Sequence, residues 1–141
     1  MPKAGVPGIP SVRPTQPKRL GEMAEAGFLA KAPRMRFAVA CPWGDSERYD
    51  FIVGAGGKLW RVQLKSAHRV GQDGCYSFRM HGSSLAAYQE KDVDVLVAYV
   101  VPEDAWYLFP VRALRGLRSL KLFSGAGGGG RSSRRIGKRG G

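Results

Sequence analysis

Residues 48–67 read RYDFIVGAGGKLWRVQLKSA and contain the pattern that decides the fold. Two runs rich in β-branched and aromatic residues lie on either side of the glycine-rich stretch 54–57, which predicts a β-hairpin. Asp50, Gln63 and Lys65 interrupt the apolar character of the two strands. Because side chains alternate between the two faces of a strand, the polar residues can share one face and the apolar residues the other.

The glycine turn also predicts how the two strands pair. A loop of two or four residues at the glycines would pair Phe51 with Trp60 and Asp50 with Arg61. Asp50 and Gln63 would then be diagonal neighbours, about 7–8 Å apart at the backbone. The apolar face would hold Phe51, Val53, Trp60, Val62 and Leu64. The polar face would hold Asp50, Arg61, Gln63 and Lys65.

This polar face combines a carboxylate, an amide and an amine. Asp50 and Gln63 supply oxygen ligands of the kind that Mg²⁺ prefers. A bound Mg²⁺ stabilises charge on a phosphate, and the Lys65 ammonium can orient a water molecule or stabilise the transition state. A hairpin with one solvated face and no catalytic role fits the same pattern, so geometry alone leaves both interpretations open.

The other segments predict a single α/β domain. Helical spacing and a proline in the first turn predict a helix over 18–31, which Pro33 ends. Strands are expected at 35–43, 74–82, 93–101 and 105–111, and the continuous apolar run 93–101 predicts a strand that is covered on both faces. Helices are expected at 83–92 and at 112–123, the latter basic and amphipathic. Together these elements predict a central mixed β-sheet flanked by helices.

Charge and composition divide the chain into three parts. The chain has 23 basic and 11 acidic residues, a net charge of +12, which favours a polyanionic partner such as nucleic acid. Residues 124–141 contain five basic residues, eight glycines and no acidic residue, and residues 1–17 contain five prolines. Both ends are therefore expected to be disordered, around an ordered domain at 18–123.

The cysteines and the hydropathy pattern indicate the cellular compartment in which the protein is expected to act. Two cysteines, Cys41 and Cys75, do not make a disulfide framework. No signal peptide is recognisable, and no apolar run approaches the length of a membrane span. We therefore expect a cytoplasmic protein with reduced thiols.

Five segments, in this order, resemble the PD-(D/E)xK nuclease family, and in particular its bacterial branch that includes group I intron homing endonucleases. They are KRLGEMAEAGFLAK (18–31), WGDSERYDFIV (43–53), LWRVQLKSA (59–67), VDVLVAYV (93–100) and WYLFPV (106–111). The resemblance implies a restriction-endonuclease-like core. It also implies a metal-dependent DNA endonuclease that hydrolyses phosphodiester bonds with Mg²⁺, for which Mn²⁺ could substitute.

The resemblance assigns roles to individual residues. Asp50 matches the metal-binding aspartate, Lys65 matches the catalytic lysine, and Gln63 occupies the acidic position of the (D/E)xK tripeptide. Glu22, in GEMAE, matches the helix glutamate that completes the metal site, and Glu25 is the alternative. The backbone carbonyl of Leu64 is a further implied metal ligand.

Two positions depart from the family pattern. Tyr49 stands where the family often has proline. Gln63 replaces a carboxylate and so removes one negative charge, which would leave Glu22 with a larger share of the metal binding. A QxK variant resembles a subset of this family.

The expected partner is DNA. The candidate contacts are Arg48, Arg61, Ser66, His68, Arg131, Arg134 and Arg135. Because cutting both strands of a duplex requires two active sites, we expect a homodimer or a larger homo-oligomer. Two other functions stay open: a non-catalytic nucleic-acid-binding protein that retains the fold, and a structure-specific nuclease such as a junction resolvase.

Overall fold

The computed structural model describes residue 8, residues 16–80 and residues 91–125. The helix expected at 83–92 lies almost entirely outside these residues, as does most of the basic tail. The elements are α1 (Pro17–Lys31), η1 (Ala32–Met35), β1 (Ala38–Ala40), β2 (Phe51–Ala55), β3 (Lys58–Ala67), β4 (Cys75–Arg79), β5 (Val95–Val100), η2 (Val101–Glu103), β6 (Ala105–Pro110), η3 (Val111–Leu114) and β7 (Ser119–Phe123), where η marks a 3₁₀ helix.

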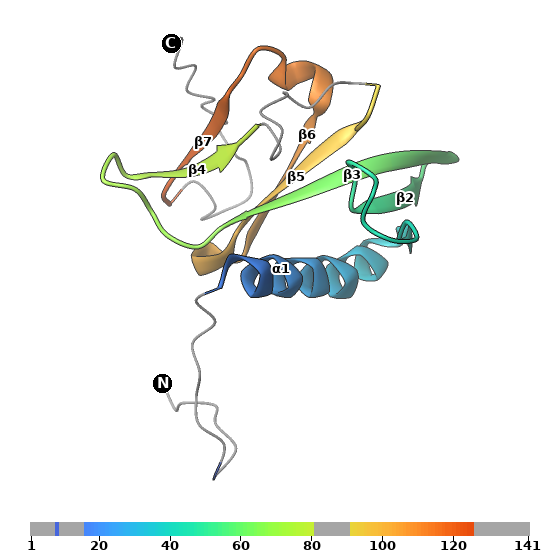
Figure 1. The fold of residues 1–141 in the computed structure, drawn as a ribbon, viewed down its shortest axis with the longest axis horizontal. Coiled ribbons are helices and arrows are strands. Elements are labelled where there is room, and N and C mark those ends of the chain that lie inside the picture. Colours follow the sequence, from blue (N-terminus) through green and yellow to red (C-terminus); the bar gives the residue numbers. More distant parts are fainter. Residues whose placement is uncertain (1–7, 9–15, 81–90, 126–141) are drawn as a thin grey trace.

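Five strands form the central sheet in the order β1-β2-β3-β5-β6 (Figure 1). The β3–β5 pair is parallel and the other three pairs are antiparallel, so the prediction of a mixed sheet is confirmed. The expected strand at 93–101 is β5, and Leu96, Val97 and Ala98 are each at most 2% exposed. Consecutive residues of β5 are therefore buried on opposite faces, as the apolar run predicted.

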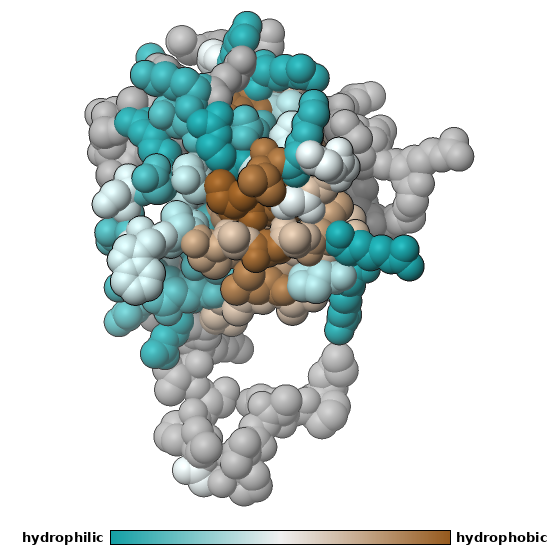
Figure 2. Space-filling model, turned by 90° about the vertical axis from the view of Figure 1, so that its right-hand side faces the viewer, coloured by the Kyte–Doolittle hydropathy of each residue, from teal (hydrophilic) through white to brown (hydrophobic). Residues whose placement is uncertain are grey.

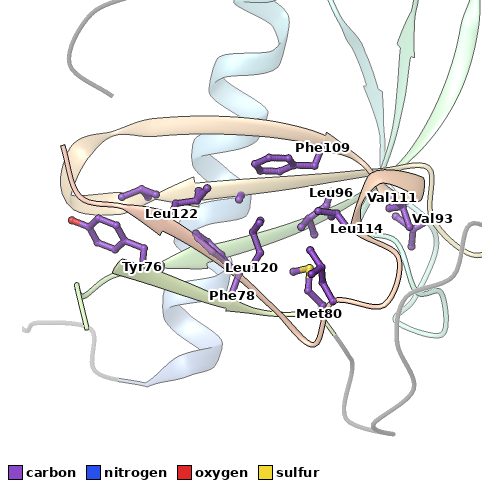
Figure 3. Close-up of a cluster of buried hydrophobic side chains, with 14 residues drawn as sticks. Tyr76, Phe78, Met80, Val93, Leu96, Phe109, Val111, Leu114, Leu120 and Leu122 are labelled. Atoms are coloured by element: carbon purple, nitrogen blue, oxygen red, sulfur yellow. The ribbon is translucent and has the colours of Figure 1, made fainter. Parts of the chain in front are cut away.

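Two apolar clusters cover the two faces of the central sheet. On one face, α1 packs through Ala24 and Phe28, and the Phe28 ring stacks on Phe51 with 4.8 Å between centroids. On the other face lies a second sheet, formed by the strands β4 and β7. Figure 3 shows the cluster between this pair and the central sheet, with Phe78 and Leu120 among its members. Within the described residues, no helix has the length and apolar character needed to cross a membrane.

The hairpin between β2 and β3 turns over two residues. Ala55 pairs with Lys58, so only Gly56 and Gly57 form the loop. Their φ angles are +60° and +76°, which matches the type I′ turn that joins antiparallel strands most tightly. Glycine reaches this left-handed region without the steric cost that a Cβ atom would add.

The tight turn gives a register that differs from the predicted one. Phe51 pairs with Val62, so the predicted pairs Phe51–Trp60 and Asp50–Arg61 are wrong by two residues. Because the shift is even, each side chain stays on its predicted face, and a shift by one residue would have reversed the faces. The division into an apolar and a polar face is therefore confirmed.

The helix expected at 112–123 is also wrong. Residues Val111–Leu114 form one 3₁₀ turn, Gly116 has a φ of +74°, and the chain then enters β7. Leu120 and Leu122 are buried while their neighbours are not, which is the two-residue period of a strand. Pairing with β4 along five residues decided between the helical and the extended conformation of this leucine-rich stretch.

Candidate active site

Asp50 is held at the point where β2 begins. Its backbone N–H donates to the carbonyl oxygen of Val62 at 2.8 Å, and its carboxylate Oδ2 accepts a hydrogen bond from the Leu64 N–H, also at 2.8 Å. Asp50 is thus anchored to the residues on both sides of Gln63. The carboxylate lies next to the QLK tripeptide, at the polar face that the alternation predicted.

Gln63 and Lys65 project from the face of β3 opposite α1. Their neighbours Val62 and Leu64 are buried in the cluster under α1, so the alternation of the strand places Gln63 and Lys65 on the other side. The parallel ladder with β5 fixes them beside Leu96 and Ala98 at the centre of the sheet. Both side chains are half-buried, which restricts their motion and the access of water to them.

The electrostatic environment ties Asp50 to Lys65. Burial raises the pKa of the Asp50 carboxyl above its usual value, while the Leu64 N–H and the positive charge of Lys65 lower it. The ammonium of Lys65 is therefore close enough to stabilise the ionised carboxylate. The structure brings together Asp50, Gln63 and Lys65, three of the four predicted catalytic residues.

The helix α1 brings two glutamates toward this group. The pKa of Glu25 is raised, first by loss of solvent around the carboxyl group, then by the negative charges of Asp50 and Glu22. Glu25 is therefore within electrostatic reach of Asp50. The charge of Asp50 that acts on Glu25 favours this residue, the alternative to Glu22, as the partner of Asp50.

The donor set fits a hard divalent cation. The carboxylate of Asp50 is half-buried and that of the exposed Glu25 lies within its field, so each opposes the other's ionisation, and a cation between them would remove that cost. In residues 16–80 and 91–125, no three His, Cys, Asp or Glu side chains lie close enough to hold a metal by themselves. Gln63 and backbone oxygens would therefore have to supply further ligands.

The Leu64 carbonyl is suitably oriented for such a role. In an extended strand the N–H and C=O of one residue point to the same side. The Leu64 N–H points to Asp50, so its carbonyl oxygen also lies on the Asp50 side. β2 pairs with β3 only as far as Val62, so it does not cover this edge of Leu64.

Arg61 has a structural partner. Its guanidinium donates to both carboxylate oxygens of Asp94, at 3.1 Å from Nε and 3.0 Å from Nη2, and its backbone N–H donates to Asp94 Oδ2 at 2.8 Å. This pairing lowers the pKa of Asp94. The Arg61 side chain therefore joins β3 to the start of β5, and Arg61 is not among the proposed DNA contacts.

The other predicted contacts lie around the site. Arg48 is exposed, and its guanidinium is 4.0 Å from the carboxylate of Asp92. Ser66 and His68 contact each other, with 3.2 Å between Oγ and Nε2, and burial lowers the pKa of His68. The predicted contacts Arg131, Arg134 and Arg135 lie outside the described residues.

A cavity on the α1 side of the central sheet is a separate feature. An apolar groove of about 640 Å³ opens between α1 and the central sheet, with Phe28, Trp60, Trp106 and Leu108 among its lining residues. Figure 2 shows hydrophobic residues gathered on this side of the molecule. Gln63 and Lys65 lie on the opposite face of the sheet, so the groove does not contain the polar group.

Comparison with known proteins agrees with this geometry. A family model described as PD-(D/E)XK endonuclease matches residues 15–122, more than half of the chain. The chain belongs to this family. The PD-(D/E)XK assignment supports a nuclease, and the matched range includes every described candidate of the site.

A solved structure extends the likeness to the fold as a whole. The chain is similar to the bacterial homing endonuclease I-Ssp6803I, with a TM-score of 0.70 and 25% sequence identity. The match covers 88% of this chain and 85% of that chain. None of the curated proteins compared matches the sequence. The PD-(D/E)XK family and the homing endonuclease together support endonuclease activity.

Proposed function

We propose that the chain is a Mg²⁺-dependent DNA endonuclease whose active site consists of Asp50, Glu25, Gln63, the Leu64 carbonyl and Lys65. The observation that carries the proposal is the position of Asp50, hydrogen-bonded to the backbone on both sides of Gln63 and within the field of Lys65. The homing endonuclease neighbour supports DNA as the substrate.

Each residue of the proposed active site would have a defined role. Asp50 and Glu25 bind the cation through carboxylate oxygens, and Gln63 and the Leu64 carbonyl add neutral oxygen ligands. When bound, Mg²⁺ would stabilise charge on the scissile phosphate and lower the pKa of the attacking water. Lys65 donates a hydrogen bond that orients this water and stabilises the negative charge that develops on the phosphate. The hydrogen bond from Leu64 holds Asp50 in place during these events.

Replacing Asp50 with asparagine tests the metal site directly. The amide side chain would keep an oxygen that can accept the Leu64 N–H, but it would lose the charge that binds the cation. We expect calorimetry of the full chain to give Mg²⁺ binding at least about 10-fold weaker, because one of only two carboxylates is lost. Asp45→Asn, in the exposed loop before the site, is the matched control and should bind Mg²⁺ as the parent does.

The Asp50→Asn variant also separates the nuclease from a non-catalytic DNA-binding protein. Mg²⁺-dependent cleavage of a mixed panel of linear and branched DNA, lost in Asp50→Asn, supports the nuclease. Binding of DNA without cleavage, and Mg²⁺ binding that is equal in the parent and in Asp50→Asn, would refute the proposed site. Preference for branched DNA would point to a junction resolvase.

We infer that the active form is a homodimer or a larger homo-oligomer. Residues 16–80 and 91–125 contain one such site, and cutting both strands of a duplex requires two. Light scattering of the full chain at micromolar concentration is expected to give at least twice the mass of one chain. A mass of one chain under conditions that support double-strand cleavage would contradict the inference.

The two cysteines are unpaired, which agrees with action in the cytoplasm.

A further inference from the structure

The two-stranded sheet of β4 and β7, here called the ribbon, has two different faces. Its inner face carries Tyr76, Phe78, Leu120 and Leu122, which are buried against the central sheet (Figure 3). Its outer face carries Ser77, Arg79, Ser119 and Lys121, none of which is buried, and ends at the pair of Cys75, which is buried, and Phe123. The buried inner face holds the ribbon in place, so its outer face presents side chains from a rigid support.

Ser77, Arg79, Ser119 and Lys121 form a row of hydrogen-bond donors on the outer face. The register places Ser77 beside Lys121 and Arg79 beside Ser119. Directly opposite side chains on one face of an antiparallel pair lie about 4.5–5.5 Å apart at Cβ, so the four residues form one continuous patch. Each of the four side chains can donate a hydrogen bond, and none is a carboxylate.

Positive charge is concentrated at one end of this patch. Lys121 forms an ion pair with Asp73, in the turn before β4, so its charge is balanced. Arg79 and Arg118, at the other end, are exposed and form no ion pair with any residue in the described part of the chain. The cationic end is therefore the end that β4 reaches at Arg79.

That end is next to the candidate active site. Met80 follows Arg79, and its N–H donates to the Arg118 carbonyl oxygen at 3.0 Å. Met80 also lines a small cavity together with Gln63 and Leu117. The side chains of the ribbon end and of the catalytic face thus meet around one cavity.

We propose that the outer face of the ribbon enters the major groove of the DNA substrate and reads base edges there, with Arg79 as the principal specificity residue. This inference rests on the proposed DNA endonuclease function. The major groove, about 12 Å wide, admits a two-stranded β-ribbon, and arginine binds the O6 and N7 atoms of guanine with two hydrogen bonds. Arg118, at the loop beside the ribbon, binds phosphate and sets its position.

Selection from a random DNA library tests the base-reading role. The full chain with Lys65→Ala, in Mg²⁺, serves as the parent because it is expected to bind without cutting. We expect the parent to enrich a consensus, and the added Arg79→Ala to lose the preference for guanine at one or two positions, with discrimination reduced roughly 5- to 100-fold. Arg118→Ala should weaken binding to all sequences alike and lower the salt dependence by about one unit of slope.

Arg34→Ala is the matched control. Arg34 is equally exposed but belongs to η1, at the end of α1 on the opposite side of the sheet. It should leave the consensus unchanged, and thermal melts of all variants exclude unfolding as the cause of any change. The proposal is overturned if Arg79→Ala keeps the parental consensus, if Arg34→Ala changes it equally, or if the parent enriches no consensus.

A second measurement identifies the groove. Duplexes whose cytosines carry glucosylated hydroxymethyl groups have an obstructed major groove, and distamycin occupies the minor groove. We expect the first to reduce binding and the second to leave it unchanged, and the reverse result would refute the ribbon proposal. If the chain with Lys65 intact cuts DNA while these tests fail, only the ribbon proposal fails. If it neither binds nor cuts DNA, the nuclease proposal fails as well.

Discussion

Replacing Lys65 with alanine is expected to reduce the single-turnover rate of Mg²⁺-dependent DNA cleavage by at least about 100-fold. Lys65 is half-buried on the central strand β3, and its charge acts on the carboxylate of Asp50. An ammonium in this position would meet the water and phosphate bound beside Asp50. Its loss removes a hydrogen-bond donor that acts on the transition state, so the rate should fall more than the affinity for DNA.

A matched control is available on the same strand. Lys58 lies at the hairpin end of β3, exposed and near the ring of Trp60, and Lys58→Ala makes the same chemical change away from the site. It should cleave at the parental rate. Removing the positive charge of Lys65 should also leave Mg²⁺ binding as tight as in the parent, or tighter. A Lys65→Ala chain that cleaves as fast as Lys58→Ala would exclude Lys65 from the mechanism.

Much of the fold around the site could be predicted because the alternation of apolar and polar residues along a strand is a local property of the sequence. The apolar residues of the hairpin recur at every second position, and burial of one face is sufficient to orient all the others. An error of two residues in the register therefore moved the partner of Phe51 from Trp60 to Val62 without reversing a single side chain. The prediction that Asp50, Gln63 and Lys65 share one face did not depend on the exact turn.

The remaining features depend on tertiary contacts that a single sequence does not contain. Leu114, Leu117 and Leu120 are spaced as on a helix, but Leu120 and Leu122 are also spaced as on a strand. The two periods compete, and the partner strand β4, about 40 residues earlier, decides between them. The pairing of Arg61 with Asp94 likewise joins residues that are 33 positions apart. Neither pattern was visible as a local motif.

The choice between Glu22 and Glu25 also depends on tertiary structure, because the spacing of the two residues in the sequence does not decide which of them is the partner of Asp50. The two residues are one helical turn apart and lie near the same side of α1, so periodicity does not separate them. Docking of α1 through Ala24 and Phe28 sets how the helix is rotated against the sheet. With the helix docked in this way, the charge of Asp50 acts on Glu25 and raises its pKa.

The two glutamates should therefore respond very differently to an isosteric change. Glu25→Gln is expected to lower the cleavage rate at limiting Mg²⁺ by about 100-fold, because one of the two carboxylates that hold the cation is neutralised. Glu22→Gln serves as the matched control on the same helix face and should stay within about 3-fold of the parent, since Glu22 is not among the proposed metal ligands. Excess Mg²⁺ should restore part of the Glu25→Gln rate, as expected for a weakened ligand set. The opposite ranking of the two variants would assign the metal site to Glu22, the residue that the GE motif favours.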